Sequence, residues 1–399
     1  MLEKILSLSG LLVFIAIGVL LSENRRAINI RLVLWGLALQ FIFALLILKT
    51  PVGYPVFEGA RVVMTGILNF TDVGASFLFG KLTTDFSMGA VVAFKVLPTI
   101  IFVSALMGVL YYYGILQAII RAMAWVMRRT MGATGIEAFM SSAFVFMGIE
   151  AITGVKHYIQ RMTRSELFCL MTGFMATIAG SVMAAYVSFG ADAGHLLAAS
   201  VMSAPASIVM AKLLVPESSG KTTDELTSVE LKSDDVNTIE ALATGAQEGV
   251  KLAITIGAML IAFVSVIGML DSLLNQLGTS FGEITGYLFS PVAIIMGVPL
   301  QDSIEVGRLL GIKVIFNEFI SYQMLQGYIQ DGTLSPRSVV IATYALCSFA
   351  NFGSLAILIG GIGGLVPERK KEVSRLGLKA LLAGTMAGFM TATIAGILI

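Results

Sequence analysis

Residues Phe144–Val155 read FVFMGIEAITGV, and a second stretch, Val314–Tyr322, reads VIFNEFISY. Each holds one acid, Glu150 or Glu318, among apolar and small residues. An isolated carboxylate within a membrane-length apolar region is costly, so it usually faces a cavity or a partner and marks a pathway. We interpret these two acids as the centre of a transport site that the rest of the chain brings together.

The composition predicts an all-α polytopic membrane protein. The 399 residues are 57% hydrophobic and 13% charged, and the mean hydropathy is +0.89. A soluble protein of this size needs far more polar surface. Apolar runs of about 20 residues recur from end to end, and each can cross a bilayer as a helix. The net charge of +1 indicates no nucleic-acid partner, and the two histidines and two cysteines are too few and too scattered for a metal site.

Eight transmembrane helices and one interfacial helix account for most of the chain. The interfacial helix is expected at Val56–Phe70, because Glu58 and Arg61 interrupt its apolar character. The expected spans are about Leu6–Leu21, Leu32–Leu48, Ala90–Tyr113, from Arg164 onward, Leu196–Leu214, Ile239–Leu273, Ser338–Leu365 and Leu376–Ile399.

Two further segments read as re-entrant helical hairpins. Gly135–Gln160 is broken by Gly148, Glu150 and Gly154 into arms of about a dozen residues, which are too short to span singly. Non-helical backbone is tolerated at membrane depth only where protein or water covers it. The broken pattern recurs over Thr285–Ile320, where we expect the second hairpin.

An internal repeat links the two hairpins. Arg164–Ser181 reads RSELFCLMTGFMATIAGS and Arg337–Ser354 reads RSVVIATYALCSFANFGS; both begin Arg-Ser, end Gly-Ser and carry an Ala-rich break near the end. Each follows a Tyr-Ile-Gln and a lone acid. Three expected spans separate the hairpins, and an odd number makes the second unit inverted. Inverted repeats with broken helices place a substrate site at mid-membrane.

The predicted organisation alternates scaffold and transport parts. It comprises residues 1–120 (N-terminal helices, interfacial helix and helix three, scaffold), 121–215 (first hairpin with helices four and five), 216–238 (polar linker), 239–280 (long scaffold helix six) and 281–399 (second hairpin with helices seven and eight). Lys and Arg gather between helices one and two, beside the first hairpin and before helix eight. Because cytoplasmic loops are rich in Lys and Arg, both termini are predicted to be extracytoplasmic.

The polar residues of the hairpins and broken helices suit a neutral polyhydroxylated ligand. Carboxylates and amides accept hydrogen bonds from sugar hydroxyls, and Phe349 could pack on a ring. No cation lies within these motifs, which argues against a phosphate ligand. Structural roles compete with this interpretation, because Asn351 could satisfy backbone freed at the helix break, and Thr177 and Ser181 could bond their own backbone. The residues expected to face a wet centre are Glu150, Glu318, Asn351, Thr177, Ser181 and Ser354.

Four segments resemble the concentrative nucleoside transporter family: Phe94–Ile115, Ser165–Ser181, Asn317–Tyr322 and Ala345–Gly363. The resemblance covers nearly the whole chain, and the Asn-Glu-Phe and Phe-Ala-Asn motifs are its most distinctive parts. It implies a homotrimer in which each protomer moves its own substrate by an elevator-like motion, and uptake driven by sodium or protons. By position it implies that the ribose is held by Glu318, Asn351 and Ser354, that Glu150 lies on the base side, and that Phe349 lies beside the base or ribose.

Two departures from the family pattern refine the expectation. Gly148 and Ile149 replace the amide and hydroxyl that the family commonly places before Glu150, which opens space and favours a purine base. Ala143 stands where sodium-coupled members have an Asn, and its partner position is Thr177. A lost oxygen ligand favours proton coupling, with Glu150, Glu318 and Thr177 as ion-coupling candidates; burial raises the proton affinity of a carboxylate.

We therefore expect a proton-coupled symporter of the bacterial inner membrane without cofactors, which imports nucleosides of the guanosine, inosine or adenosine type. The alternatives are a sodium-coupled or pyrimidine-accepting symporter and a passive facilitator on the same scaffold. An intramembrane enzyme acting on a lipid is disfavoured, because no acid pair lies close in sequence within the membrane stretches.

Overall fold

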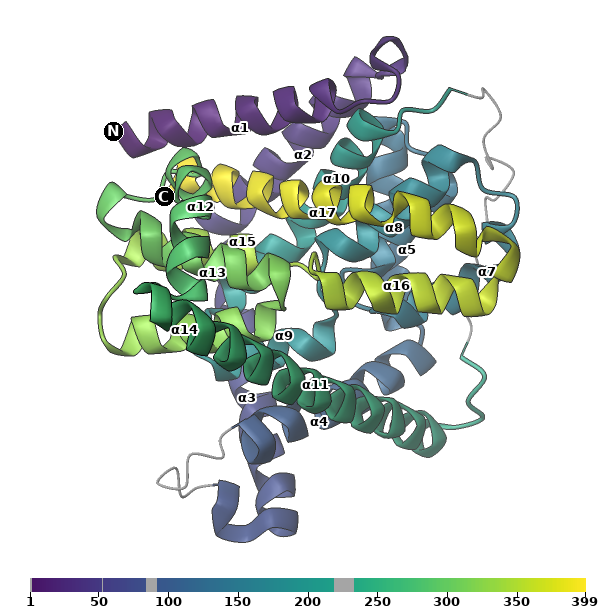
Figure 1. The fold of residues 1–399 in the computed structure, drawn as a ribbon. Coiled ribbons are helices and arrows are strands. Elements are labelled where there is room, and N and C mark those ends of the chain that lie inside the picture. The colour runs from purple at the N-terminus through teal and green to yellow at the C-terminus, as the bar shows by residue number, and fades with distance from the viewer. Residues whose placement is uncertain (1, 52, 84–91, 219–232) are drawn as a thin grey trace.

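The computed structural model describes residues 2–51, 53–83, 92–218 and 233–399. Every regular element among these residues is a helix, as the sequence predicted. Figure 1 shows the helices packed into one bundle with both ends of the chain on the same side. Most of the expected polar linker and the start of expected helix three lie outside the described residues.

Eight helices in the described part of the chain are long and apolar enough to cross a membrane, but one differs from the expected set. α3 (Gly53–Phe79) qualifies by length and composition. Expected helix seven does not qualify, because it is divided into α15 (Pro336–Leu346) and α16 (Phe352–Leu365). In Figure 1, α3 runs across the direction of α1 (Leu2–Leu20) and α17 (Lys370–Leu398). This course supports the predicted interfacial position of α3, which stays a prediction.

The first repeat follows α2 (Ile30–Lys49) and α3. Thr134 begins its hairpin with a reciprocal capping box: its hydroxyl accepts from Glu137 N at 3.4 Å, and Glu137 Oε2 accepts from Thr134 N at 3.1 Å. The hairpin falls within the expected Gly135–Gln160. The elements are α4 (Leu97–Tyr112), α5 (Ile115–Met131), α6 (Gly135–Ala143), a 3-10 segment (Ile149–Val155), α7 (Lys156–Ile159), α8 (Arg164–Ala176), α9 (Gly180–Ser188) and α10 (Ala193–Leu214).

The second repeat contains α11 (Thr238–Leu274), α12 (Phe281–Ile295), α13 (Ser303–Ile315) and α14 (Glu318–Gln330), followed by α15, α16 and α17. The hairpin arms are α13 and α14, so the range Thr285–Ile320 predicted for this hairpin was wrong. α12 is a separate helix, because Gly297 adopts a left-handed φ of 94° just past its end and Pro299 follows.

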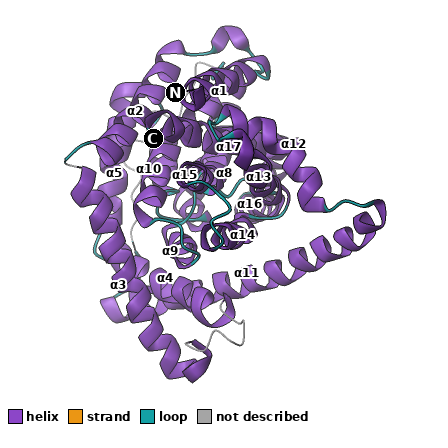
Figure 2. Ribbon diagram, turned by 90° about the vertical axis from the view of Figure 1, so that its left-hand side faces the viewer, coloured by secondary structure: helices purple, strands orange, loops and turns teal. Residues whose placement is uncertain are grey.

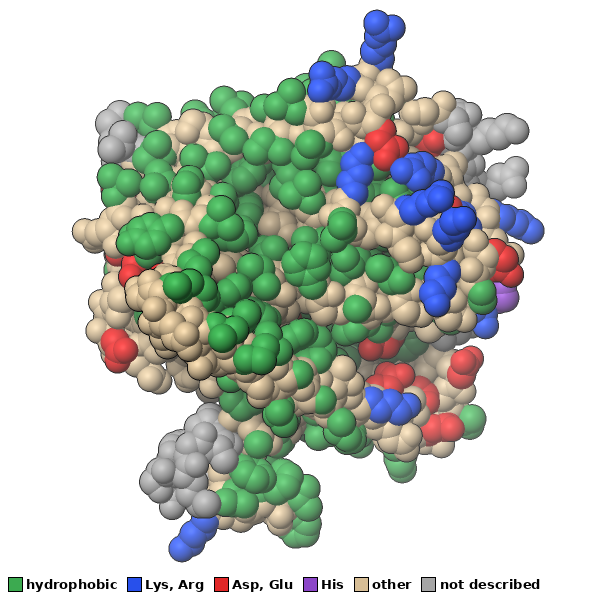
Figure 3. Space-filling view, viewed as in Figure 1, with side chains coloured by type: hydrophobic (Ala, Val, Ile, Leu, Met, Phe, Trp, Pro, Cys, Tyr) green, Lys and Arg blue, Asp and Glu red, His purple; other side chains and the backbone are tan. Residues whose placement is uncertain are grey.

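The two repeats run in opposite directions. Arg164 at the start of α8 bonds Glu23 at 2.9 Å, and the same carboxylate accepts from Lys379 near the start of α17 at 3.0 Å. Arg337 at the start of α15 donates to Gly396 O near the end of α17 at 2.6 Å. α8 and α15 therefore begin at opposite ends of α17. Figure 3 shows Lys and Arg side chains gathered at the end where α8 begins.

The broken helices form the centre of the bundle. Every residue in the most apolar part of Arg164–Ser188 is buried, whereas only 6% of the residues in the most apolar part of Thr238–Leu277 are buried. Figure 2 shows α8, α15 and α16 in the middle and α11 along one edge. α10 packs against both α8 and α17, and its Ala and Ser residues allow close approach of neighbouring helices.

Candidate functional site

The tip of the second hairpin presents Glu318 to the centre of the molecule. α14 begins here because the Asn317 side chain caps it and accepts from Ile320 N at 3.0 Å. Glu318 thus lies in the first turn of a helix, where the positive end of the helix dipole favours a carboxylate. Its side chain is only 4% exposed.

Both oxygens of the Glu318 carboxylate are hydrogen-bonded. Tyr186 Oη donates to Oε1 at 2.8 Å and Asn351 Nδ2 donates to Oε2 at 2.7 Å. Asn351 in turn caps α16, because its Oδ1 accepts from Ser354 N at 2.7 Å. One asparagine therefore serves both as the cap of a half-helix and as a partner of the buried acid, so the structural and functional roles weighed for it are compatible.

The breaks in the two interrupted helices contact each other. Phe349 N, in the α15–α16 break, donates to Thr177 O, in the α8–α9 break, at 3.0 Å. Gly180 N at the start of α9 donates to Phe146 O at the tip of the first hairpin at 3.1 Å. These bonds satisfy backbone groups freed by the breaks, as burial requires.

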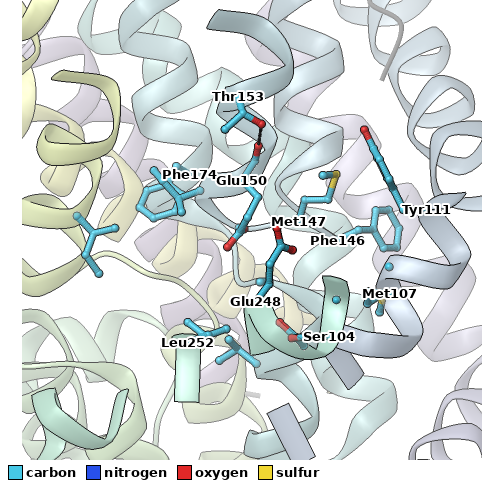
Figure 4. Close-up of a pocket in the computed structure, with 18 of the residues that line it drawn as sticks. Ser104, Met107, Tyr111, Phe146, Met147, Glu150, Thr153, Phe174, Glu248 and Leu252 are labelled. Carbon is cyan, nitrogen blue, oxygen red and sulfur yellow. Dashed lines mark hydrogen bonds between the residues drawn. The ribbon is translucent and has the colours of Figure 1, made fainter. Parts of the chain in front are cut away.

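The first hairpin brings Glu150 to the same region. Glu150 lies in the 3-10 segment, and its own backbone oxygen accepts from Thr153 Oγ1 at 2.7 Å. Figure 4 shows the Glu150 side chain pointing into a pocket that Glu248 of α11 enters from the other side. A Cβ added at Gly148 would lie 2.9 Å from Glu150 Oε2. The lack of a side chain at Gly148 thus lets the carboxylate turn toward the hairpin backbone.

A cavity of about 640 Å³ joins the two hairpins, the broken helices and the edge helices α4 and α11 (Figure 4). This volume suits a small organic molecule. Ser181 also lines it, as do Lys156, His157, Asp234 and Asp235. The cavity brings together seven residues predicted from the sequence: Gly148, Ile149, Glu150, Glu318, Phe349, Asn351 and Ser354.

Thr177 is the one predicted site residue outside the cavity lining. It is 1% exposed, and its Oγ1 donates to Gly173 O at 2.9 Å. Thr177 therefore has the backbone-bonding role that was the alternative to an ion ligand. The bond uses the hydroxyl proton, and a lone pair on Oγ1 stays available to accept another partner.

Three side chains of this region are not among the residues predicted from the sequence. Tyr186 is fully buried against Glu318, Glu248 faces Glu150 across the cavity, and Tyr111 lines the wall. Tyr186 follows the α8–α9 break by two helical turns in an otherwise apolar run, which is the signal that could have identified it. Glu248 lies in a helix read as scaffold, so its sequence context did not single it out.

The arrangement suits recognition of a neutral hydroxylated molecule. A buried carboxylate and an amide can accept and donate to ligand hydroxyls, while Phe349 and Phe174 offer apolar faces with ring centroids 5.6 Å apart. Among the described residues no group of three or more His, Cys, Asp or Glu side chains could hold a metal.

Family models match almost the whole chain. They are described as the Na+ dependent nucleoside transporter C-terminus, over residues 195–396, the N-terminus of the same family, over residues 9–82, and nucleoside recognition, over residues 93–193.

Individual proteins agree with these models. The chain is 42% identical to an uncharacterized transporter of Haemophilus influenzae, covering 98% of this chain and 97% of that protein. It is 41% identical to solute carrier family 28 member 3 of Homo sapiens, covering 99% of this chain but only 60% of that longer protein. The fold matches CNTnw in an inward-facing substrate-bound state with a TM-score of 0.93, 39% identity and coverage of 99% and 97%. A CNTnw variant in an outward-facing state matches with a TM-score of 0.94, 39% identity and coverage of 99% and 98%.

Proposed function

The chain belongs to the concentrative nucleoside transporter family, a family of transporters and not of enzymes, and from this we propose that it imports nucleosides by symport with a cation. One observation carries the proposal: Glu150 and Glu318, from hairpins in opposite repeats, line a single cavity of about 640 Å³. A site formed by two inverted units can open to either side of a membrane as they move relative to the surrounding helices.

In this proposal the ribose binds at the second hairpin. Glu318, Asn351 and Ser354 hold its hydroxyls, because the carboxylate accepts and the amide and hydroxyl can do either. Glu150 lies on the base side and Phe349 packs on the base or ribose. The cavity-lining positions of these five residues support the pose.

A preference for purine nucleosides of the guanosine, inosine or adenosine type remains part of the proposal. Gly148 has no side chain and Ile149 contributes no hydroxyl or amide, so the base side offers space and a carboxylate. A side chain at Gly148 would displace the Glu150 carboxylate, whose Oε2 lies 2.9 Å from the place of the added Cβ. A pyrimidine-accepting site is the alternative.

For the coupling ion we propose sodium, in place of the proton that Ala143 led us to expect. The family description names sodium, which weighs more than one missing side-chain oxygen. The lone pair left on Thr177 Oγ1 is one oxygen available to the ion. Because small cations prefer several oxygen ligands, Ala143 is expected to weaken the site without removing it.

Uptake into liposomes tests both substrate and ion. Purified protein should accumulate labelled guanosine or inosine above equilibrium under an inward sodium gradient, and collapsing that gradient should abolish accumulation. Accumulation that depends on a pH gradient and not on a sodium gradient would indicate proton coupling instead. Uridine transport without competition by purine nucleosides would contradict the purine preference, and counterflow without uphill accumulation would indicate a passive facilitator.

Substitution at the hairpin tip sharpens the ion test. Ala143→Asn adds an amide oxygen where sodium-coupled members carry it, so the sodium concentration for half-maximal uptake should fall several-fold. Ala138→Asn, which adds the same group to the same buried arm of the hairpin, is the matched control and should not lower it.

We also propose a homotrimer in a bacterial inner membrane with an elevator motion and both termini outside. Lys and Arg gathered at one end of the molecule support that orientation (Figure 3). Large apolar side chains of α11, such as Ile254, Ile261 and Val264, are 50–74% exposed and offer a surface for other copies of the chain. Native mass spectrometry in detergent should report three copies; a monomer would contradict this assembly.

A further inference from the structure

One buried cation has no part in the binding site described above. Lys313 lies on α13 close to the tip of the second hairpin, and its side chain is 0% exposed. Its Nζ donates to Ser348 Oγ at 2.7 Å, and Ser348 is equally buried. An ammonium group held in a low-dielectric interior by a neutral hydroxyl is costly, so other groups must offset its loss of hydration.

Negative charge from three sources surrounds Lys313. It lies in the last turn of α13, and Ser348 follows the last turn of α15. Helix C-terminal ends carry partial negative charge and leave carbonyl groups without helical partners. The Glu318 carboxylate lies five residues further along the chain, in the first turn of the next helix. Lys313 is therefore placed to act as a countercharge for Glu318 without lining the cavity.

Lys313 also ties the hairpin to the broken helix. The hairpin tip and the α15–α16 break are joined twice, by Lys313 to Ser348 and by Asn351 to Glu318. A Cβ added at Gly388 of α17 would lie 3.2 Å from Ser348 Oγ, so α17 leaves the hydroxyl little room to move away. The hydrogen bond from Lys313 thereby holds Ser348, the first residue of the short segment Ser348–Asn351, in place.

We propose that Lys313 is a positioning residue, a cation built into the protein that keeps Glu318 ionised and holds Asn351 in place for ribose binding. The inference rests on the proposed nucleoside site. Burial alone favours the neutral acid, and a protonated Glu318 has fewer lone pairs for ribose hydroxyls. The other titratable side chains that interact with this pair are Tyr186, Tyr322 and Cys347.

Binding measurements on purified Lys313→Met test the charge. Calorimetry from pH 6 to pH 9 should show nucleoside affinity about tenfold or more weaker near neutral pH, recovering as the pH rises, because loss of a charged hydrogen bond typically costs that much. A 2′,3′-dideoxy nucleoside lacks the hydroxyls, so its affinity should change much less. Lys313→Arg should restore most of the loss. Equal weakening of both ligands at every pH would mean a merely structural lysine and would overturn the proposal.

Thermal unfolding gives a second readout that needs no ligand. Lys313→Met should lower Tm less in a Glu318→Gln background than in the wild type, because no buried carboxylate then loses its countercharge. Equal losses in the two backgrounds would contradict the charge coupling.

Two serine variants separate the effect of the Lys313–Ser348 hydrogen bond from the effect of the Lys313 charge. Ser348→Ala should weaken nucleoside binding without the pH dependence. Ser207→Ala removes a buried hydroxyl from α10, a different helix, and should leave nucleoside binding unchanged. Wild-type protein that binds no nucleoside would sink the proposed function. Wild-type binding with Lys313→Met unchanged would sink this inference alone.

Discussion

At the scale of single residues, the chemistry of the cavity converges on Glu318. Its carboxylate is buried, bonded on both oxygens, and placed at the positive end of α14. Such a group has a few remaining lone pairs aimed in fixed directions, and the ligand that fills them must bring hydroxyl or N–H donors. Preorganisation of this kind lowers the entropy lost on binding.

Glu318→Gln tests that role. Replacing an ionised acceptor by a neutral amide removes about 1.5–3 kcal/mol per hydrogen bond, so nucleoside affinity should fall at least about tenfold and uptake should drop to background. Calorimetry and liposome uptake measure the two effects, and a melting curve shows whether the protein stays folded. Unchanged uptake by a folded variant would make Glu318 a structural acid.

Tyr186→Phe removes the donor to Glu318 Oε1 while keeping the ring. Affinity should weaken about tenfold, since one hydrogen bond to a charged group is lost. Tyr322→Phe is the matched control: its ring is stacked on that of Tyr186 with centroids 4.2 Å apart, but its hydroxyl donates to Thr343 O. The control should lower Tm and leave affinity unchanged, and equal affinity losses in both variants would argue against a specific role of Tyr186.

At the scale of elements, one wall of the cavity is made by α4 and α11, which pack along each other. Glycines allow their backbones to approach, because a Cβ added at Gly245 would lie 2.6 Å from Ser104 O, and one at Gly108 would lie 2.6 Å from Ala241 O. Real Cβ atoms do not come this close to a backbone oxygen, so larger residues would force the helices apart.

Gly245→Ala should therefore cost about 1–3 kcal/mol of stability by overpacking, and it should also weaken nucleoside binding because Glu248 and Leu252 lie on the displaced helix. Gly327→Ala in α14 meets nothing within 4 Å and should keep or slightly raise Tm. Differential scanning fluorimetry compares the two. A Gly245→Ala protein as stable as the wild type would show that α4 and α11 can separate at little cost.

At the scale of the whole molecule, Glu23 links the loop after α1 to the inverted repeats. Its carboxylate accepts from Arg164 at 2.9 Å and from Lys379 at 3.0 Å, and its backbone N donates to Leu214 O at 2.9 Å. The hydrogen bond from Arg164 is the main cause that lowers the pKa of Glu23 below its usual 4.5. This cluster joins the N-terminal helices to α8, α10 and α17.

The pH dependence of this cluster follows from the sign of the shift. A carboxyl group with a lowered folded-state pKa contributes stability above its unfolded pKa and loses it as the pH falls through the folded value. The wild type should therefore be more stable than Glu23→Gln at neutral pH by the free energy typical of exposed pairs, about 0–1 kcal/mol, which appears as a small increase in Tm. The difference should disappear well below pH 4.5 and shrink in high salt. A difference that grows on acidification would contradict this account.

Much of the architecture could be predicted from the sequence alone. Long apolar runs have few options in a bilayer other than helices, and the isolated acids Glu150 and Glu318 needed a cavity or partner. The Arg-Ser to Gly-Ser repeat correctly predicted both broken helices, because the corresponding segments of the two halves have the same structure. The second hairpin was placed too early, because α12 is as apolar as a hairpin arm and only the turn at Gly297 separates them.

The tertiary structure alone decided which polar groups meet. Tyr186 and Glu248 lie on helices far from Glu318 and Glu150 in the sequence, and nothing local to either residue indicates which acid is its neighbour. Likewise Thr177 turns its hydroxyl to its own helix and stays outside the cavity lining. Hydrophobic patterning depends on spacing along one helix and can be read from the chain, whereas a hydrogen bond or countercharge depends on distances between helices, which only folding sets.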